Sequence, residues 1–396
     1  MSSIHDTIHE ILPEIIALRH ELHQHPEIRF EEKWTSARVA AFLDTCGIPY
    51  KTGFARGTGI VATVQGVGPR TVALRADIDA LEIEEETGLP YASRIPKRMH
   101  ACGHDGHTAI LCGVAKVLSR HLDQVTGSVK LVFQPAEEIA GGARYMVEDG
   151  AIDGVDAIFG LHGWPTLPLG AVGVKDGFMM ASARDFHIEI TGKGCHGADP
   201  AAGIDSIVVA AHVITALQTI VSRQINPWDS GVVTVAMLEA GQATNIIPER
   251  ATLRGTIRWL DEAVGQRLRD RIETVAHGVA SAFGAQASVT LGESYYPAVC
   301  NDPQAVDTLR GVVRDTLGAE AIKEIPVPSM GAEDFAYYLR KVPGAFFWLG
   351  VNPNANTPYP QLHNPHYDFN DEALPIGMTC MTAVAMRYLE RGFSRQ

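Results

Sequence analysis

The sequence predicts an α/β protein with two domains: a mixed, mostly parallel sheet with helices on both faces, and an inserted ferredoxin-like α+β domain. Three observations support this prediction. The first 180 residues alternate short apolar runs with helical patterns, which is typical of parallel strands joined by helices. From about residue 185 to about residue 293 the order changes to β-α-β-β-α-β, the order of a ferredoxin-like sandwich. A chain of 396 residues also exceeds the size at which a single core usually stops growing.

Strands in the first part of the chain are predicted from three apolar runs, at residues 71–75, 129–133 and 157–161. Open α/β sheets place their sites at the carboxyl ends of the strands. After Gly106, apolar residues recur at helical spacing, so residues 102–107 are expected to form the loop that enters a helix. The polar residues that follow the three runs are Asp77 and Asp79, then Glu137 and Glu138, and last His162.

The inserted domain is expected to span residues 185–293. His363 lies beyond this insertion, and it must return to the first domain if it is to join the other polar residues. The catalytic domain is therefore expected to be discontinuous, with residues 1–184 and 294–396, and the insertion can act as a lid. Within the insertion, periodicity predicts strands at 186–190, 232–238, 251–257 and 287–291, and helices at 204–221 and 262–283.

The composition argues against nucleic acid and anionic membranes as partners. The net charge is −13 and there is no basic run to neutralise phosphates, so small solutes are the expected partners. The N-terminal segment is charged throughout and lacks a continuous apolar core, so we expect neither a signal peptide nor a membrane span. Six widely scattered cysteines are too sparse for a disulfide scaffold, and we expect reduced thiols in a cytoplasmic protein.

Five side chains that can bind a metal ion fall at predicted strand ends or in loops: Cys102, His104, Glu138, His162 and His363. In the densest segment, HACGHDGH, glycines let the backbone bend so that a thiol and imidazoles can converge on one point. Thiolate, imidazole and carboxylate ligands together suit Zn²⁺ or a similar borderline divalent ion. The sequence therefore predicts a metal site at this edge of the sheet.

Glu137 directly precedes one of these candidate ligands. A carboxylate that lies beside a metal ion without binding it can take the proton of the attacking water, as hydrolysis requires. The pattern predicts a metallohydrolase with Glu137 as the general base. Taken alone, the adjacent acids could form a solvated turn, and Cys102 with His104 could be a buried thiol beside a loop histidine. Spacing also does not choose between His363 and His366 as a ligand.

The inserted domain carries a second group of polar residues: His196, Asn245 and Arg258. Each of them could simply be a surface residue. An arginine that faced the metal site would offer a fork matched to a substrate carboxylate. Near the N-terminus, His23 and its neighbouring histidines lie on the polar side of a predicted helix, so we expect surface or packing roles for them.

Ten motifs occur in order along nearly the whole chain: RHELHQHPE, RADIDAL, MHACGHDGHT, QPAEE, GLHGWP, GKGCHGADP, TNIIPE, GTIR, MGAEDFA and LHNPHYDF. Through these motifs the chain resembles the aminoacylase and carboxypeptidase metallopeptidases of clan MH, in the branch of hippurate hydrolases, N-acyl-L-amino acid amidohydrolases and IAA-amino acid hydrolases. The resemblance implies a dinuclear site for Zn, Mn, Ni or Co in which Cys102 bridges two ions. The other implied ligands are His104, Glu138, His162 and, by its place in the family motif, His363.

The resemblance also implies roles for residues outside the ligand set. Glu137 would be the general base and then the general acid. Asp79 would support a metal-binding side chain without binding the metal itself. Asn245 and Arg258 would bind substrate, and His196 would hold the oxyanion in the active site of a neighbouring subunit. The implied assembly is a homodimer, or a dimer of dimers, formed through the inserted domain.

The expected reaction is hydrolysis of an N-acyl amino acid, with N-benzoyl (hippurate-like) compounds among the candidates, to a carboxylic acid and a free amino acid. The substrate carboxylate would lie toward Arg258 and Asn245. A dipeptidase or carboxypeptidase with the same site is the nearest alternative. Two alternatives belong to other classes: a metal-free thiol amidohydrolase with Cys102 as nucleophile and His104 as base, and a metal- or ligand-binding protein without catalysis.

Overall fold

The computed structural model describes residues 3–354 and 357–393 and divides into two compact units. The first unit comprises Met1–Met179, Val299–Pro328 and Asp334–Gln396, and the second comprises Met180–Ala298 with Ser329–Glu333. The insertion expected at residues 185–293 therefore lies within the second unit, which also takes in flanking residues.

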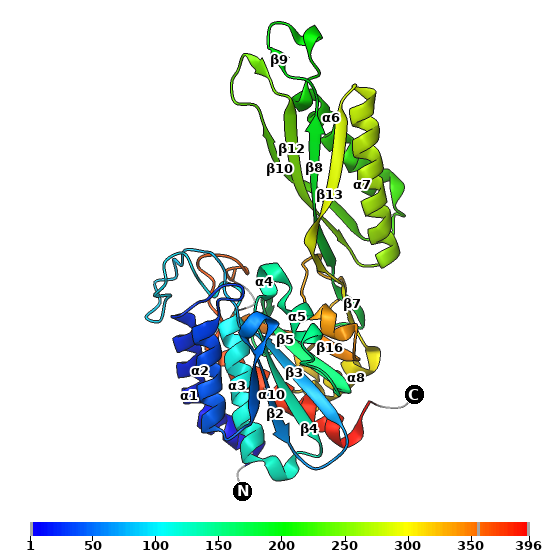
Figure 1. Ribbon diagram of the computed structural model, residues 1–396. Helices are drawn as coiled ribbons and strands as arrows, with labels where there is room; N and C mark the ends of the chain where they lie inside the picture. Colours follow the sequence, from blue (N-terminus) through cyan, green and yellow to red (C-terminus); the bar gives the residue numbers. More distant parts are fainter. Residues whose placement is uncertain (1–2, 355–356, 394–396) are drawn as a thin grey trace. The chain divides into compact units, whose positions relative to one another are not determined.

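The first unit is built on an eight-stranded mixed sheet with the order β1-β2-β4-β3-β5-β16-β6-β15 (Figure 1). Its central strands β4, β3, β5 and β16 run parallel to one another. Strand β16 is buried along its whole length, so both faces of the sheet are covered there, as expected for an α/β sheet. The strands are β1 (Tyr50–Phe54), β2 (Gly59–Gln65), β3 (Thr71–Asp77), β4 (Ser128–Gln134), β5 (Ala157–Pro168), β6 (Val172–Val174), β15 (Ile322–Glu324) and β16 (Gly344–Asn352). The three apolar runs predicted to be strands are β3, β4 and β5.

Helices α1, α3 and α10 pack against one another, and α3 and α10 also contact β3. Their apolar residues form the main core together with the sheet. Ile15, Leu111 and Val384, for example, are fully buried. The helices of this unit are α1 (Ile4–His23), α2 (Lys33–Thr45), α3 (His104–Arg120), α4 (Glu137–Ala140), α5 (Gly142–Glu148), α8 (Pro303–Leu317), α9 (Ala336–Leu339) and α10 (Leu374–Arg391). A small ribbon pairs β14 (Val299–Asn301) with β7 (Gly177–Met180).

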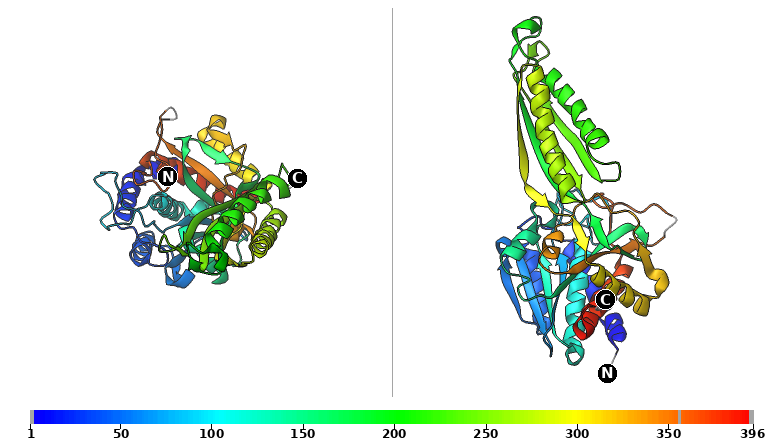
Figure 2. Two further views of the ribbon diagram at one scale, coloured as in Figure 1. Left: turned by 90° about the horizontal axis from the view of Figure 1, so that it is seen from above. Right: turned by 90° about the vertical axis from the view of Figure 1, so that its right-hand side faces the viewer.

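The second unit has the predicted ferredoxin-like topology. Its antiparallel sheet has the order β10-β12-β8-β13, and helices α6 and α7 pack against it and against each other (Figures 1 and 2). A two-stranded ribbon, β9 with β11, lies beyond one end of this sheet (Figure 1). The elements are β8 (Ser182–Thr191), β9 (Cys195–His196), α6 (Ser206–Thr219), β10 (Gly231–Ala240), β11 (Ile246–Ile247), β12 (Arg250–Trp259), α7 (Glu262–Ala282) and β13 (Gln286–Tyr296).

One helical stretch, Ser206–Gln224, is long and apolar enough to cross a membrane by length and composition alone. It contains α6, whose residues Val209, Val213 and Leu217 are buried in the core of the second unit. One side of this stretch therefore packs in the core of the second unit.

Candidate metal centre

The structure brings the five predicted ligands together in the first unit. Donor atoms of Cys102, His104 and His162 all lie within 4.8 Å of one another, and the same is true of Cys102, Glu138 and His363. They come from the loop before α3, the start of α3, strand β5, the start of α4 and the loop before α10. All but His363 and the partly exposed Glu138 are buried. Residues more than 250 positions apart thus meet beside the carboxyl ends of β3 and β4. The expectation that His162 follows its strand was wrong, because β5 continues to Pro168 and His162 lies within it, paired with Trp348 of β16.

Local backbone conformation makes this convergence possible. Gly103 has a φ of 86° at the position that begins α3, and a Cβ there would lie 3.0 Å from Tyr367 and Phe369 atoms. His363 has a φ of 65°, and its N–H donates to the Ala101 carbonyl at 2.8 Å. A positive φ is unfavourable for a residue with a Cβ and persists only where the surroundings impose it. The hydrogen bond to Ala101 thus holds His363 beside Cys102.

The hydrogen bonds of the two buried histidines leave one nitrogen of each aimed into the site. Nδ1 of His104 donates to the Asp79 carbonyl at 3.0 Å, and Nδ1 of His162 donates to the Gly163 carbonyl at 2.8 Å. In the neutral rings, Nε2 therefore carries the lone pair. Nε2 of His162 lies 3.3 Å from Sγ of Cys102, and Nε2 of His104 is buried without a hydrogen-bond partner among the described residues. Both rings fit metal ligation through Nε2.

Glu138 links two of the histidines. Its Oε2 lies 3.3 Å from Nε2 of His363 and its Oε1 lies 3.8 Å from Nε2 of His104. Within the described parts of the chain, Oε1 is a buried atom with no hydrogen-bond partner. The backbone N–H of Glu138 donates to Oδ2 of Asp79 at 3.1 Å, and the Asp79 carbonyl holds His104. Asp79 thus supports two candidate ligands.

The electrostatics of the cluster favour a bound cation. Burial, and then the Glu138 and Glu137 carboxylates, raise the pKa of the Cys102 thiol well above its usual range. Burial alone would lower the pKa of His104, but Asp77, Asp79 and Glu138 outweigh it and raise that pKa to about 10. A group of buried acids that stabilises a proton on a histidine will also stabilise a divalent ion in its place. The residues present therefore fit the metal that the sequence predicts.

Glu137 is buried beside the candidate ligands. One of its carboxylate oxygens lies within 4.8 Å of ligand atoms of His104 and Glu138, and its Oε1 accepts the N–H of Asp334 at 3.4 Å. His366, the alternative to His363, is not part of this cluster. Its Nδ1 donates to the Glu86 carbonyl at 2.9 Å.

The three polar residues predicted in the insertion do not form one cluster within the second unit. His196 and Asn245 are neighbours, because His196 pairs with Ile246 and the Gly197 N–H donates to the Asn245 carbonyl at 2.7 Å. Arg258 lies at the other end of β12, which begins at Arg250. Arg258 is eight positions after Arg250 on this strand, which corresponds to roughly 26 Å. Within one copy of this unit, Asn245 and Arg258 are therefore too far apart to bind the same small ligand.

The exposed ring of His196 presents a hydrogen-bond donor. Its Nδ1 accepts the N–H of Ala198 at 3.1 Å, so the proton of the neutral ring lies on Nε2. Arg258 is half-buried on β12, and burial lowers the pKa of its guanidinium.

Sequence reasoning missed a buried ion cluster beside the site, centred on Arg19 of α1. Its fully buried guanidinium donates to Asp105 and Asp371, each at 2.9 Å, and to Asp368. Nδ1 of His23 also bonds Asp105, at 2.8 Å. Asp105 follows His104 and Asp368 lies in the loop after His363, so this cluster joins the two segments that carry those ligands. A signal was present in the sequence, since Arg19 lies at helical spacing from the apolar residues of α1.

A second hydrogen-bond network, which the sequence also did not reveal, supports strand β5. Fully buried Arg75 donates to Asp77 at 2.7 Å and to Asp334 at 2.9 Å. Nδ1 of His107 donates to Asp77 at 2.7 Å, and its Nε2 accepts the Gly163 N–H at 2.8 Å. Both ring nitrogens of His107 are thus engaged, which separates it from the candidate ligands although it lies close to His104.

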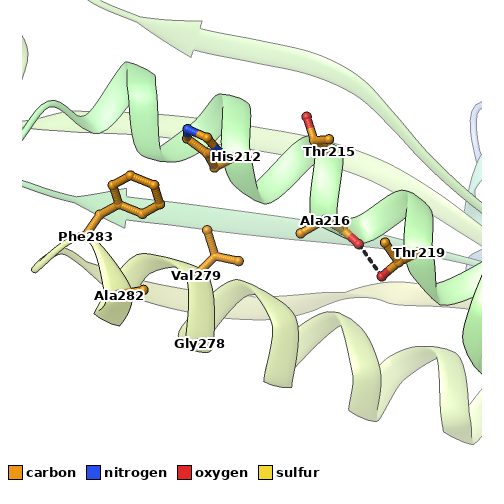
Figure 3. Close-up of a pocket in the computed structure, with 8 residues that line it drawn as sticks. All are labelled: His212, Thr215, Ala216, Thr219, Gly278, Val279, Ala282 and Phe283. Atoms are coloured by element: carbon orange, nitrogen blue, oxygen red, sulfur yellow. Dashed lines mark hydrogen bonds between the residues drawn. The ribbon is translucent and has the colours of Figure 1, made fainter.

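A hollow of about 380 Å³ lies between α6 and α7 in the second unit (Figure 3). His212 stacks on Phe283 in it, with ring centroids 4.7 Å apart. Its lining is mainly apolar and contains none of the predicted site residues: His212, Thr215, Ala216, Thr219, Gly278, Val279, Ala282 and Phe283.

A family model described as peptidase family M20/M25/M40 matches residues 73–387, most of the chain. The chain belongs to this family. Its relatives include an N-acetyl-L-cysteine deacetylase from Bacillus subtilis, 42% identical over 91% of this chain and 85% of the relative. An IAA-amino acid hydrolase, ILR1-like 4, from Arabidopsis thaliana is 41% identical over 95% of this chain and 86% of the relative. The predicted class, a metal-dependent hydrolase of amide bonds, is confirmed by this membership and these relatives.

The fold is also that of solved members of the family. A dinuclear metal-binding peptidase of the M20 family from Bacillus subtilis has a TM-score of 0.83 and 35% identity, and the match covers 96% of this chain and 99% of that one. The predicted family and fold class are thus confirmed, and candidate metal-binding groups are present where the sequence predicted them.

Proposed function

We propose that the chain hydrolyses the amide bond of N-acyl amino acids to a carboxylic acid and a free amino acid. The observation that carries the proposal is that a thiol, three imidazoles and a carboxylate form two groups of donor atoms that share Cys102, with Glu137 buried beside them. The names of relatives support the substrate class, since one is an N-acetyl-L-cysteine deacetylase and another an IAA-amino acid hydrolase.

Two divalent ions would be held by Cys102, His104, Glu138, His162 and His363. Zn, Mn, Ni and Co all suit this mixture of donors. When bound, the ions supply Lewis acidity, which polarises a carbonyl and makes water acidic enough to lose a proton near neutral pH.

Side chains of the protein carry out proton transfer, oxyanion stabilisation and substrate binding. A carboxylate oxygen of Glu137 takes a proton from the attacking water and later delivers it to the leaving amine. Nε2–H of His196 donates to the oxyanion that develops on the amide carbonyl. The guanidinium of Arg258 binds the substrate carboxylate through paired hydrogen bonds. Asn245, next to His196, contributes its side-chain amide to substrate binding.

His196 and Asn245 serve the active site of a partner subunit in this proposal. The support comes from the second unit alone: both residues lie beyond the Arg250 end of β12, and Arg258 lies roughly 26 Å along that strand from Arg250. One substrate cannot meet all three side chains of a single copy of this unit. A homodimer or dimer of dimers would supply Arg258 from one chain and the partner's His196 from the other.

Exposed apolar residues support dimerisation through the second unit. Ile207 and Val208 on α6 are 41% and 45% exposed, and Met237 and Leu238 on the edge strand β10 are 47% and 48% exposed. Large exposed apolar side chains on a helix and on an edge strand are typical of an interaction surface. The cytoplasm fits the cysteines, all six of which are free thiols.

A dipeptidase or carboxypeptidase activity remains the main competing hypothesis, and one relative is a thermostable carboxypeptidase from Saccharolobus solfataricus, 35% identical over 98% of each chain. The thiol-nucleophile alternative is disfavoured, because burial and neighbouring carboxylates raise the pKa of Cys102 and so reduce its thiolate.

The test is metal analysis of the purified protein, followed by assays of released amine from N-acetyl, N-benzoyl and indoleacetyl amino acids and from unblocked dipeptides. Turnover of the acylated compounds, abolished by a chelator, is expected. Preference for unblocked dipeptides would replace the proposal with a dipeptidase. Glu137→Gln should keep its metal yet lose on the order of 10²-fold or more in kcat, and near-native turnover would remove Glu137 from its role.

A further inference from the structure

The carboxylate of Glu32 is fully buried, and no step of the proposed reaction uses it. Glu32 occupies the position that begins α2, where a short polar side chain usually caps the helix, but its side chain makes no capping bond. Instead Oε1 accepts the N–H of Ala136 at 3.0 Å and Oε2 accepts the hydroxyl of Thr58 at 3.0 Å. The carboxylate therefore joins α2 to the residue directly before Glu137, 104 positions away.

The backbone at Ala136 needs such a support. Ala136 has φ 57° and ψ 42°, a left-handed conformation that disfavours residues with a Cβ. This conformation turns the chain from the end of β4 into α4, whose first residue is Glu137. A residue remains in this region only where its surroundings impose it.

The carbonyl of Ala136 is held as well as its N–H. The N–H of Gly142 donates to the Ala136 carbonyl at 2.9 Å, and a Cβ on Gly142 would lie 1.7 Å from the Pro135 oxygen. Two separate carboxylates then hold the peptides on either side of Glu137, since Asp79 accepts the N–H of Glu138 at 3.1 Å while Glu32 accepts that of Ala136.

We propose that Glu32 is a positioning residue, which holds the Ala136 peptide in its left-handed conformation and thereby aims the carboxylate of Glu137. The role rests on the proposed function, in which Glu137 moves the proton. Because Asp79 independently holds Glu138, loss of Glu32 should disturb Glu137 more than it disturbs the metal ligand. Burial, and then the charge of Asp79, raise the pKa of Glu32 to about 8, so a neutral side chain that can accept the Ala136 N–H should serve as well.

The test compares four variants as holoenzymes of measured metal content. Glu32→Met keeps the length of the side chain but leaves the Ala136 N–H without its acceptor. Glu32→Gln retains an amide oxygen for that N–H and can donate to Thr58. Thr58→Val removes one support of the carboxylate and is the milder perturbation if Glu32→Met does not fold. Val39→Ala is the matched control, because Val39 is fully buried on the same helix, seven positions after Glu32, and carries no hydrogen-bonding side chain.

We expect Glu32→Met to lower kcat by about 10- to 100-fold, the range that a displacement near 1 Å can produce. KM and metal content should stay near wild type. Amide hydrogen exchange, read from peptides that cover Ala136, should accelerate in Glu32→Met and less in Thr58→Val. Glu32→Gln should restore both kcat and protection, and Val39→Ala should leave both unchanged.

A wild-type kcat in Glu32→Met, unchanged exchange at Ala136, or equal losses in Val39→Ala would overturn the positioning role. These outcomes are separable from failure of the proposed function, which Glu137→Gln tests directly and which does not depend on the exchange measurement.

Discussion

The buried histidine beside Arg19 predicts a specific dependence of stability on pH. Nδ1 of His23 lies 2.8 Å from Asp105 and Nε2 lies 3.2 Å from Glu85, and the ring is fully buried. Burial alone would lower the pKa of His23, but Asp105 and Glu85 outweigh it and raise the pKa from 6.5 to about 9. Both nitrogens of a charged imidazolium can then donate to a carboxylate.

The sign follows from linkage. Because the folded protein binds this proton more tightly than the unfolded chain, the stabilisation is fully present below about pH 6.5 and is lost as the pH rises through about 9. A difference of about 2.5 in pKa corresponds to on the order of 3 kcal/mol, at about 1.4 kcal/mol for each pKa unit.

The assay is urea unfolding of wild type and His23→Gln at several pH values from 6 to 10, with a chelator present so that metal binding does not contribute. The wild type should be more stable at pH 6, and this difference in unfolding free energy should shrink by on the order of 3 kcal/mol by pH 10. His121→Gln is the matched control, because His121 is also buried but bonds the neutral hydroxyl of Thr7. A difference between wild type and His23→Gln that is constant over this range would refute the charged-imidazolium interpretation.

Three further predictions concern the proposed reaction. Cys102→Ala should lower the metal content measured by elemental analysis, because loss of a bridging thiolate weakens both sites, and full occupancy would contradict the bridge. Arg258→Ala should reduce kcat/KM for free-acid substrates about ten- to a hundredfold while sparing their carboxamide analogues, since a charge-assisted hydrogen bond is worth roughly 1.5 to 3 kcal/mol. Equal losses on both would move the carboxylate site elsewhere. Mixing inactive Glu137→Gln and His196→Ala subunits should restore roughly a quarter of wild-type activity in a two-subunit assembly if His196 acts in trans, whereas no recovery despite proven subunit exchange would place its action within one subunit.

Local patterns in the sequence predicted the fold class and most of the residues that meet in the candidate metal centre, whereas the choice of His363 over His366 came from the family motif. Short apolar runs predicted strands β3, β4 and β5. Polar residues directly after β3 and β4 indicate a shared sheet edge, because parallel strands end on the same side. The order of strands and helices in the insertion likewise predicted its ferredoxin-like sheet. The assignment of His104 and its neighbours as ligands remains a prediction, although the structure places their donor atoms together.

Only the tertiary structure decided how these residues are supported. The contact of Glu32 with Ala136 spans 104 positions and that of Arg19 with Asp368 spans 349, and neither leaves a periodic pattern in the sequence. The place of His196 beside Asn245, at the opposite end of β12 from Arg258, depends on the pairing of β9 with β11, which no motif in the sequence predicted. Periodicity reports which side of an element is buried, whereas the partner of a buried charge depends on how distant segments pack.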